Sequence, residues 1–278
     1  MQVKPFAEPI GAEITGLRPG ALQDPDTIGE LRQALHQHLV VVVRDHDLGI
    51  EGQVDLTRLF GQPELAWDRR SRHPDNPHIQ VMNSAPRPVS APASSSQFWH
   101  TDGSFLPAPP STTLLAIQQL PVSGGDTLFV DTRSAYESLD ASARSCLRDL
   151  ELIFSYRYRL YGLQTMKYGG DDGGELEDHP DVRHPLVRHH PATKRAALYL
   201  DQLCASGVAG MAPADSTELL ERLYAHTLVP ERQYQHIWRQ SDMLIWDNPS
   251  LMHRRGTNHE GPRLLYRTTA AGPRPVHA

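Results

Sequence analysis

The sequence predicts a mostly β fold, a sandwich or barrel with helices packed against its outside. Short runs rich in Val, Ile, Thr and aromatic residues follow one another from residue 78 onward, separated by Gly, Pro, Asn and Asp. Helices of any length are few after residue 60. The chain has 278 residues, of which 39% are hydrophobic and 22% charged, as is typical of a globular protein. Because no repeat or change in composition divides it, we expect one domain over residues 1–278.

The first elements expected are a helix, a buried strand and a second helix. Thr27 and Glu30 form a capping-box pattern at the start of an amphipathic helix that runs to about His38. The run Leu39–Val43 is too continuously apolar for a half-exposed strand, so we expect it to be covered on both faces. A second amphipathic stretch ends at Gly61, a residue typical of the position just after a helix.

The rest of the chain predicts strands, a few helices and two long irregular segments. Strands are expected at His78–Met82, Thr112–Gln118, Thr127–Val130, Ile153–Tyr158, Ala196–Asp201, Tyr234–Trp238, Met243–Trp246 and Leu264–Thr269. Helices are expected at Arg133–Leu139, Ala141–Leu150 and Asp215–His226, with Asp215 or Ser216 as the N-cap of the last. Segments 84–96, rich in Pro, Ser and Ala, and 162–184, which contains GGDDGGELEDHPD, are predicted to be lid insertions because of their length.

Composition excludes several classes of partner. The formal net charge is −6, so there is no global basic field to bind a nucleic acid. No apolar run reaches the roughly 20 residues that cross a bilayer, and the N-terminus lacks the core of a signal peptide. Cys146 and Cys204 show no Cys-x-x-Cys pairing and are interpreted as buried free thiols in a reducing compartment. We therefore expect a cytoplasmic protein that binds a small molecule. Its oligomeric state stays open, and a homo-oligomer is possible at this stage.

Three His-x-Asp triplets are the first candidates for a metal site. Roughly one is expected by chance at this composition, so the triplet alone is a weak signal. His73-Pro74-Asp75 and His179-Pro180-Asp181 contain proline in turn-rich surroundings and are interpreted as surface turns. His100-Thr101-Asp102 lies among aromatic residues that can exclude water, and residues 100 and 102 of an extended chain project from one face.

A distant histidine would complete a metal site with this middle triplet. An imidazole, a carboxylate and a second imidazole form the 2-His-1-carboxylate triad, which occupies one face of Fe(II) and leaves three positions open. His253 is the best candidate for the second histidine, because it follows the apolar run Leu244-Ile245-Trp246 that predicts a buried strand. No H-E-x-x-H motif or cysteine cluster favours a hydrolytic zinc site instead.

Around these residues the sequence resembles the taurine dioxygenase (TauD/TfdA) family of Fe(II)/2-oxoglutarate-dependent dioxygenases. Four blocks carry the resemblance in the family's order and spacing: Trp99-His100-Thr101-Asp102, Gly124-Gly125-Asp126-Thr127-Leu128-Phe129, Trp246-Asp247-Asn248 leading to His253, and Arg263-Leu264-Leu265-Tyr266-Arg267. The similarity extends from Gly11 over nearly the whole chain. It implies a double-stranded β-helix, the cupin-like jelly roll, with the metal ligands at one open end of the barrel.

The resemblance also implies roles for individual residues. His100, Asp102 and His253 match the family's catalytic iron ligands. Thr127 matches the hydroxyl that helps to hold 2-oxoglutarate. Arg263 matches the arginine whose planar guanidinium pairs with the distal carboxylate of that cosubstrate.

Arg267 matches a family arginine that often meets an anionic substrate. Phe105 is expected beside it, where an apolar surrounding strengthens its pairing with an anion. Arg263 and Arg267 share a strand face only if no bulge interrupts the strand; a slip of one residue would bring Tyr266 to the pocket instead.

The reaction implied by the resemblance is oxidation, with hydroxylation favoured, of a small and anionic organic substrate by Fe(II), 2-oxoglutarate and O₂, releasing succinate and CO₂. Asp102 stands where halogenating relatives carry a small residue, which disfavours halogenation. Two alternatives stay open at this stage. One is desaturation, cyclisation or isonitrile formation on an amino-acid-derived metabolite with the same cofactors, and the other is a noncatalytic jelly-roll ligand-binding protein.

Overall fold

A seven-stranded sheet is the largest element of the fold. The computed structural model describes residues 1–84, 97–158, 179–256 and 259–278. Its strand order is β1-β2-β3-β14-β5-β17-β4. Neighbouring strands are antiparallel except β2 and β3, which are parallel. The bounds are β1 Gln2–Pro5, β2 Ala12–Thr15, β3 Val40–Val43, β14 Met243–Asp247, β5 Thr112–Gln119, β17 Arg263–Ala270 and β4 Gln80–Ser84.

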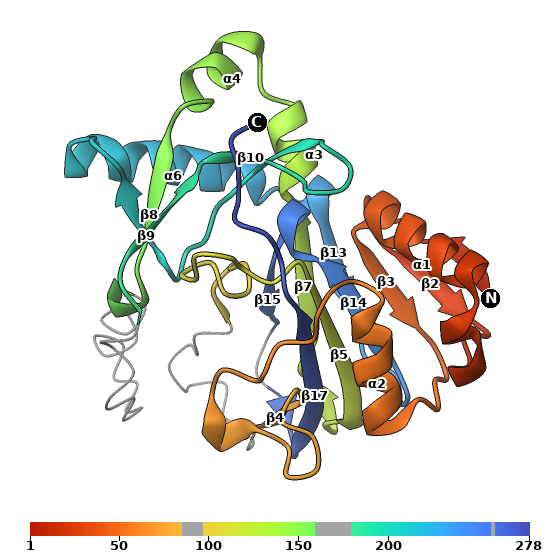
Figure 1. Cartoon of the computed structure of the whole chain (residues 1–278). Coiled ribbons are helices and arrows are strands. Elements are labelled where there is room, and N and C mark those ends of the chain that lie inside the picture. Colours follow the sequence, from red (N-terminus) through yellow and green to blue (C-terminus); the bar gives the residue numbers. More distant parts are fainter. Residues whose placement is uncertain (85–96, 159–178, 257–258) are drawn as a thin grey trace.

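A three-stranded sheet of order β13-β7-β15 packs against the large sheet (Figure 1). Its strands are β13 Gln233–His236, β7 Thr127–Asp131 and β15 Leu251–Arg255. Phe129 and Leu251 from the small sheet share one buried cluster with Trp246 and Leu265 from the large sheet. Two facing sheets around a common core make the jelly roll that the sequence predicts, so the mostly β fold is confirmed.

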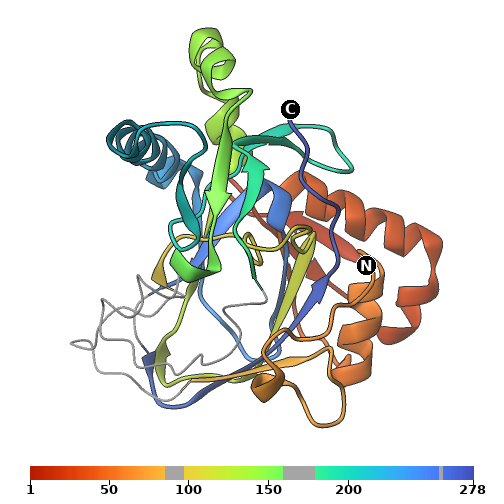
Figure 2. The same ribbon diagram turned by 60° about the vertical axis from the view of Figure 1, so that its left-hand side comes forward.

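Helices and smaller sheets surround this barrel. Helices α1 (Pro25–His38) and α2 (Gly49–Arg58) cover the outer face of the large sheet, where α1 contacts β3 and β14 and α2 contacts β5 and β17 (Figure 2). A second core includes Val130 and Met252 and so packs on the opposite face of the three-stranded sheet, among the remaining helices and strands. These are α3 Thr132–Glu137, α4 Ala141–Leu147, α6 Pro213–Thr227, the sheet of β12 Ala205–Val208, β8 Glu151–Phe154 and β9 Val182–Pro185, and the pair β10 Val187–His189 and β11 Ala196–Leu198. The short strands β6 Ser123–Gly124 and β16 His259–Glu260 pair with each other.

Strand β3 is covered on both faces, as its unbroken apolar run predicts. All its residues have no exposed surface. Val41 and Val43 belong to the cluster that contains helix α1, whereas Val40 and Val42 belong to the cluster between the two sheets. Alternate side chains of a strand project to opposite faces, which explains the division.

Helix starts are where the sequence prediction is wrong. The N-cap of α1 is Asp24, whose carboxylate accepts hydrogen bonds from the Thr27 backbone N–H (3.1 Å) and hydroxyl (2.6 Å), so Thr27 is not the cap. Helix α6 begins at Pro213 with Ala212 at the N-cap, ahead of the predicted Asp215 or Ser216. In both helices a proline occupies the first turn, where its fixed φ and missing N–H are tolerated.

Two predicted element ends and two lid boundaries also need correction. Helix α2 ends at Arg58, and Gly61 is required because a Cβ there would lie 2.9 Å from the carbonyl oxygen of Ala271. Strand β8 stops at Phe154, after which residues 156–158 are helical. The predicted lids largely lie outside the described residues; of their ends, Ser84 belongs to β4 and residues 182–184 to β9.

Cysteine placement agrees with the sequence prediction in part. Both thiols are free, but Cys204 is buried whereas Cys146 is exposed on α4. Within the ranges that the structure describes, no helix has both the length and the apolar character needed to cross a bilayer.

Candidate metal centre and its cavity

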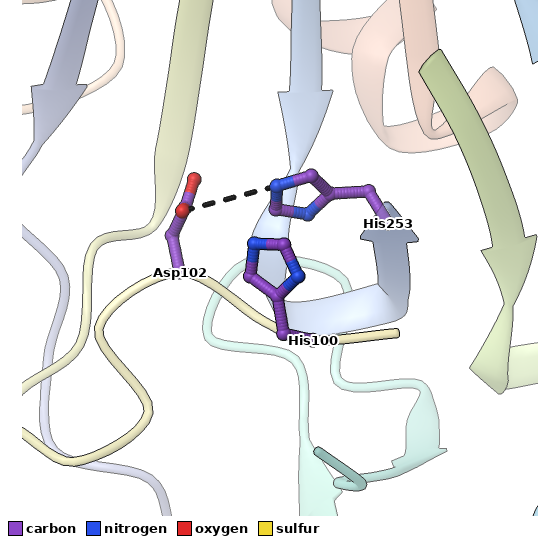
Figure 3. Close-up of side chains that lie close together, drawn as sticks. All are labelled: His100, Asp102 and His253. Carbon is purple, nitrogen blue, oxygen red and sulfur yellow. Dashed lines mark ion pairs between the residues drawn. The ribbon is translucent and has the colours of Figure 1, made fainter. Parts of the chain in front are cut away.

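His100, Asp102 and His253 converge at one end of the barrel (Figure 3). One ligand atom of each lies within 4.8 Å of the others, and among the described residues no other group of three such side chains is this close. The two imidazole centroids are 4.3 Å apart, and His253 Nε2 lies 3.8 Å from Asp102 Oδ1. The structure therefore brings together the three residues that the sequence singled out.

The backbone fixes the two histidines relative to each other. The His100 N–H donates to the His253 carbonyl (3.0 Å), and the His253 N–H donates to the His100 carbonyl (2.8 Å). His253 reaches this position because the chain leaves β14 through a 3₁₀ turn at Asn248–Ser250 and enters β15 in the other sheet. The apolar run before it is thus not the strand that carries it, which corrects the sequence prediction.

A hydrogen bond orients the His100 ring as a metal ligand requires, whereas the His253 ring is held by packing. The Nδ1–H of His100 donates to the Phe98 carbonyl (2.8 Å), because a carbonyl can only accept, and this leaves the Nε2 lone pair for a metal. The His253 ring packs against Trp246, with centroids 4.8 Å apart. Burial, followed by the charge of His100, lowers the pKa of His253 to about 3, so this ring is neutral at physiological pH.

Asp102 is held as an ionised carboxylate. Its Oδ1 accepts from the Arg267 guanidinium (3.2 Å) and its Oδ2 from the Thr113 hydroxyl (2.7 Å). Burial alone would raise the pKa of Asp102, but Arg267 and the two histidines lower it more strongly, to below its usual range.

Sequence reasoning missed the residues that support Asp102. Thr113 accepts from the Asn248 side-chain amide (2.9 Å), and the Asn248 oxygen accepts from Trp246 Nε1 (2.9 Å). The block Trp246-Asp247-Asn248 therefore reaches the metal site through Thr113. The sequence showed the block Trp246-Asp247-Asn248, but its contact with Thr113 could not be predicted because it depends on the pairing of β14 with β5.

Asp201 is a second supporting residue that the sequence did not reveal. Its fully buried carboxylate accepts from the Thr101 N–H (3.2 Å) and the Ser104 hydroxyl (2.6 Å), and also from the N–H groups of residues 203 and 204. The turn between them requires glycine, since Gly103 has φ +61° and a Cβ there would lie 2.7 Å from Pro110. The turn that carries His100 and Asp102 is therefore rigidly anchored.

A cavity of about 310 Å³ opens beside the three side chains, and β17 forms one of its walls. Arg263, Leu265, Arg267 and Thr269 all line it, whereas Tyr266 packs outside against His73 with ring centroids 5.1 Å apart. A bulge does interrupt the pairing of β17 with β5, but its extra residue, Gln118, is on β5. The alternation of β17 therefore survives, and both arginines face the cavity.

One end of the cavity is formed by Arg263 and Thr127. Arg263 is 4% exposed, and its buried Nε has no hydrogen-bond partner. Burial, with a contribution from Arg255, lowers the pKa of Arg263 to about 10, which leaves it charged at neutral pH. Trp238 Nε1 donates to the Thr127 hydroxyl (3.2 Å), so the hydroxyl proton can be donated elsewhere.

Gly125 explains why this end carries a glycine pair. Its φ is +77°, and a Cβ there would lie 3.1 Å from both Cδ and Nε of Arg263. The arginine thus packs directly on the backbone of the Gly124-Gly125 turn. A side chain at residue 125 would be strained and would press against Arg263.

Arg267, Phe105 and an aromatic group lie at the other end. The Arg267 side chain is 17% exposed, and Phe105 lines the cavity beside Trp67. The Phe105 ring also contacts Tyr156 and His179, with centroids 4.8 and 5.2 Å away. His179 is therefore half-buried against this aromatic group and is not a plain surface turn, which corrects the sequence interpretation. His73 lies in a turn, where its Nδ1 accepts from the Asp75 N–H (3.2 Å), but its side chain is only 10% exposed and packs against Tyr266, so it is not a plain surface turn either.

Comparison with known proteins identifies the relatives of this arrangement. The family model described as taurine catabolism dioxygenase TauD, TfdA family matches residues 2–269. Pentalenolactone F synthase from Streptomyces arenae is 30% identical over 267 residues, 91% of this chain and 89% of that protein. An alpha-ketoglutarate-dependent sulfate ester dioxygenase from Pseudomonas putida is 30% identical over 286 residues, 99% of this chain and 91% of that protein. The crystal structure of AAD-2 in complex with Mn(II) and N-oxalylglycine matches with a TM-score of 0.82 and 27% identity, covering 99% of this chain and 98% of that one.

Proposed function

The chain belongs to the TauD, TfdA dioxygenase family, and we propose that His100, Asp102 and His253 hold its Fe(II) while it hydroxylates a small organic anion. As a member of this family it is an oxidoreductase that depends on Fe(II), 2-oxoglutarate and O₂. One observation carries the site assignment: two imidazoles and an ionised carboxylate, from segments far apart in the sequence, have ligand atoms within 4.8 Å of one another.

The donor set suits Fe(II). Two neutral imidazole nitrogens and one carboxylate oxygen form the facial triad of non-haem iron oxygenases, in which the remaining positions accept cosubstrate and O₂. The hydrogen bond from His100 Nδ1 to the Phe98 carbonyl is the kind of supporting contact that fixes a metal-bound imidazole. The Thr113 hydroxyl fixes the Asp102 carboxylate in the same way.

The cavity end at Thr127 and Arg263 suits the distal carboxylate of 2-oxoglutarate. Arg263 presents a buried Nε–H without a partner, and the Thr127 hydroxyl has its proton available for donation. When bound, Fe(II), 2-oxoglutarate and O₂ supply a two-electron oxidation in which one oxygen atom enters the substrate and the other enters succinate, with release of CO₂. The work of the protein is to bind, orient and keep water out.

The cavity end at Arg267 suits an anionic group of the primary substrate. In the structure Arg267 pairs with Asp102 Oδ1, so an anion entering the cavity would compete with Asp102 for the guanidinium. Trp67 and Phe105 offer apolar surface that excludes water around this contact. A relative named as a sulfate ester dioxygenase and another named for phenoxypropionate support an anionic substrate.

Turnover assays test this proposal. Carboxylates, sulfonates, sulfate esters and amino-acid derivatives are screened for stimulated release of succinate under O₂, and isotopically labelled O₂ traces the oxygen into the product. We expect one chemical class to give substrate-dependent succinate and a product that gains one oxygen atom. A dehydrogenated or cyclised product that has not gained an oxygen atom would show desaturation or cyclisation in place of hydroxylation. Succinate release that does not depend on Fe(II) would reject the proposed metal site.

We also propose that the enzyme works in the reducing cytoplasm as a small-molecule enzyme without nucleic acid or membrane partners. The net charge of −6 and the exposed free thiol of Cys146 support this placement.

A further inference from the structure

A second arginine, Arg255, lies at the same end of the cavity as Arg263 and Thr127. It follows His253 by two residues on β15, so the two side chains project from the same face of the strand. Its direct cross-strand partner on β7 is Thr127. Since Arg255, His253 and Thr127 all line the cavity, β15 places a cation at the level of Thr127, two residues along the strand from His253.

Arg255 and Arg263 bring two positive charges to this end of the cavity. The positive charge of Arg255 acts on Arg263 strongly enough to help lower its pKa. Asp126 is the carboxylate whose charge acts on Arg263 in return, and no described residue forms an ion pair with Arg263. The two guanidinium groups repel each other across the cavity, and a carboxylate bound between them would relieve this repulsion.

We propose that Arg255 is a second cosubstrate-binding arginine, which grips the distal carboxylate of 2-oxoglutarate together with Thr127 and Arg263. Side chains of direct cross-strand partners start about 5 Å apart, so Arg255 and Thr127 can reach the same group. A carboxylate offers about four lone-pair sites on two oxygens, enough for a hydroxyl and two guanidinium groups. The inference rests on the proposed function, because it takes 2-oxoglutarate to lie between this end and the metal site.

The neighbouring residue on the same strand provides a matched control. Arg254 points to the opposite face, where its guanidinium lies 5.0 Å from the centre of the Trp99 ring, and it does not line the cavity. Arg254→Gln and Arg255→Gln remove the same charge from adjacent positions. Any difference between them therefore reports on the cavity and not on the net charge of the protein.

Calorimetric titration tests the proposal with two ligands. The protein is loaded with Zn(II) in place of Fe(II), so that ligand binding is measured without turnover. The two ligands are 2-oxoglutarate and 2-oxopentanoate, which has the same five-carbon chain and 2-oxo acid but lacks the distal carboxylate; competition gives the affinity of the weaker ligand. We expect Arg255→Gln to weaken 2-oxoglutarate about ten- to a hundredfold, the range for a charge-assisted hydrogen bond, and to change 2-oxopentanoate less than about twofold. Arg255→Lys should recover part of the loss, and Arg254→Gln should change neither ligand.

Two outcomes overturn the proposal. An equal loss of affinity for both ligands would mean that Arg255 acts on the carboxylate next to the metal or on the electrostatic potential of the whole cavity. No loss of affinity for either ligand would mean that Arg255 does not belong to the cosubstrate site. Arg263→Gln separates these failures from failure of the proposed function: if that variant also binds both ligands like the wild type, the cosubstrate end lies elsewhere in the molecule. Thermal unfolding of each variant shows whether it is folded, and Arg255→Lys keeps the test valid if the Gln variant is not.

Discussion

The two ends of the cavity are built by different kinds of structure. The end at Thr127 and Arg263 consists of side chains from β7, β15 and β17, whose positions are fixed by strand register. At the other end Glu64 and Trp67 come from the irregular segment between α2 and β4, and Phe105 follows the Gly103 turn. The comparison teaches that the proposed cosubstrate end is built by barrel strands alone, whereas the proposed substrate end adds segments at the rim to Arg267 of β17.

The ends also differ in charge. Two arginines, the buried Arg263 and the half-buried Arg255, lie at the strand-built end, which suits the proposed binding of a carboxylate there. The loop-built end combines Arg267 with Glu64, and burial raises the pKa of Glu64 above its ordinary value. Mutations at the two ends should therefore change different kinetic constants, with the metal centre between them affecting both.

The largest effect is expected at the metal centre. His253→Ala removes one of the three proposed ligands, so we expect Fe(II) affinity and turnover to fall by more than about a hundredfold, beyond the effect of losing a supporting contact. Metal titration and succinate release measure the two effects. His73→Ala is the control, because His73 lies in a turn outside the cavity; equal losses in both variants would mean general destabilisation.

The next largest effect concerns the strand-built end alone. Arg263→Ala should raise the KM for 2-oxoglutarate about ten- to a hundredfold, because a charge-assisted hydrogen bond is worth about 1.5–3 kcal/mol. Thr127→Ala should cost less, since it removes a single hydroxyl donor. Steady-state kinetics with saturating substrate measure both, and an unchanged cosubstrate KM in Arg263→Ala would move the carboxylate site to another part of the cavity.

Much of the strand-built end could be predicted from sequence, and most of the loop-built end could not. Thr127 and Arg263 belong to short blocks whose spacing reflects strands, and β17 keeps its alternation because the bulge falls on β5. Asp201 meets Thr101 from 100 residues away along the chain, without any local pattern to indicate the contact. Glu64 is placed by the hydrogen bond from its N–H to the Thr269 carbonyl (2.9 Å), which depends on tertiary structure only.

A smaller and more selective effect is expected from Arg267. The Arg267→Leu variant should raise the KM for the anionic substrate about tenfold, as for the loss of one charge-assisted hydrogen bond, while the KM for 2-oxoglutarate stays near that of the wild type. Because Arg267 also contacts Asp102, Fe(II) affinity is measured in parallel. If Fe(II) affinity falls and the substrate KM does not change, Arg267 is a structural partner of Asp102 and the anion is bound elsewhere.

The smallest expected effect is a pH-dependent change in thermal stability that arises from Glu64 at the loop-built end of the cavity. Because burial raises the pKa of Glu64 above its ordinary 4.5, with Thr269 and Arg267 opposing the shift, the folded protein binds this proton more tightly than the unfolded chain does. The contribution of Glu64 to stability is therefore present at low pH and lost as the pH rises through the folded-state value. Glu64→Gln removes that loss, so near pH 7 the variant should unfold about 1–3 °C higher than the wild type, and the difference should disappear toward pH 4. Thermal unfolding across this range measures the effect, and 2-oxoglutarate affinity should not change, because Glu64 belongs to the loop-built end. A difference in unfolding temperature that is the same at every pH would show that side-chain packing, and not the carboxyl charge, sets the stability of this end.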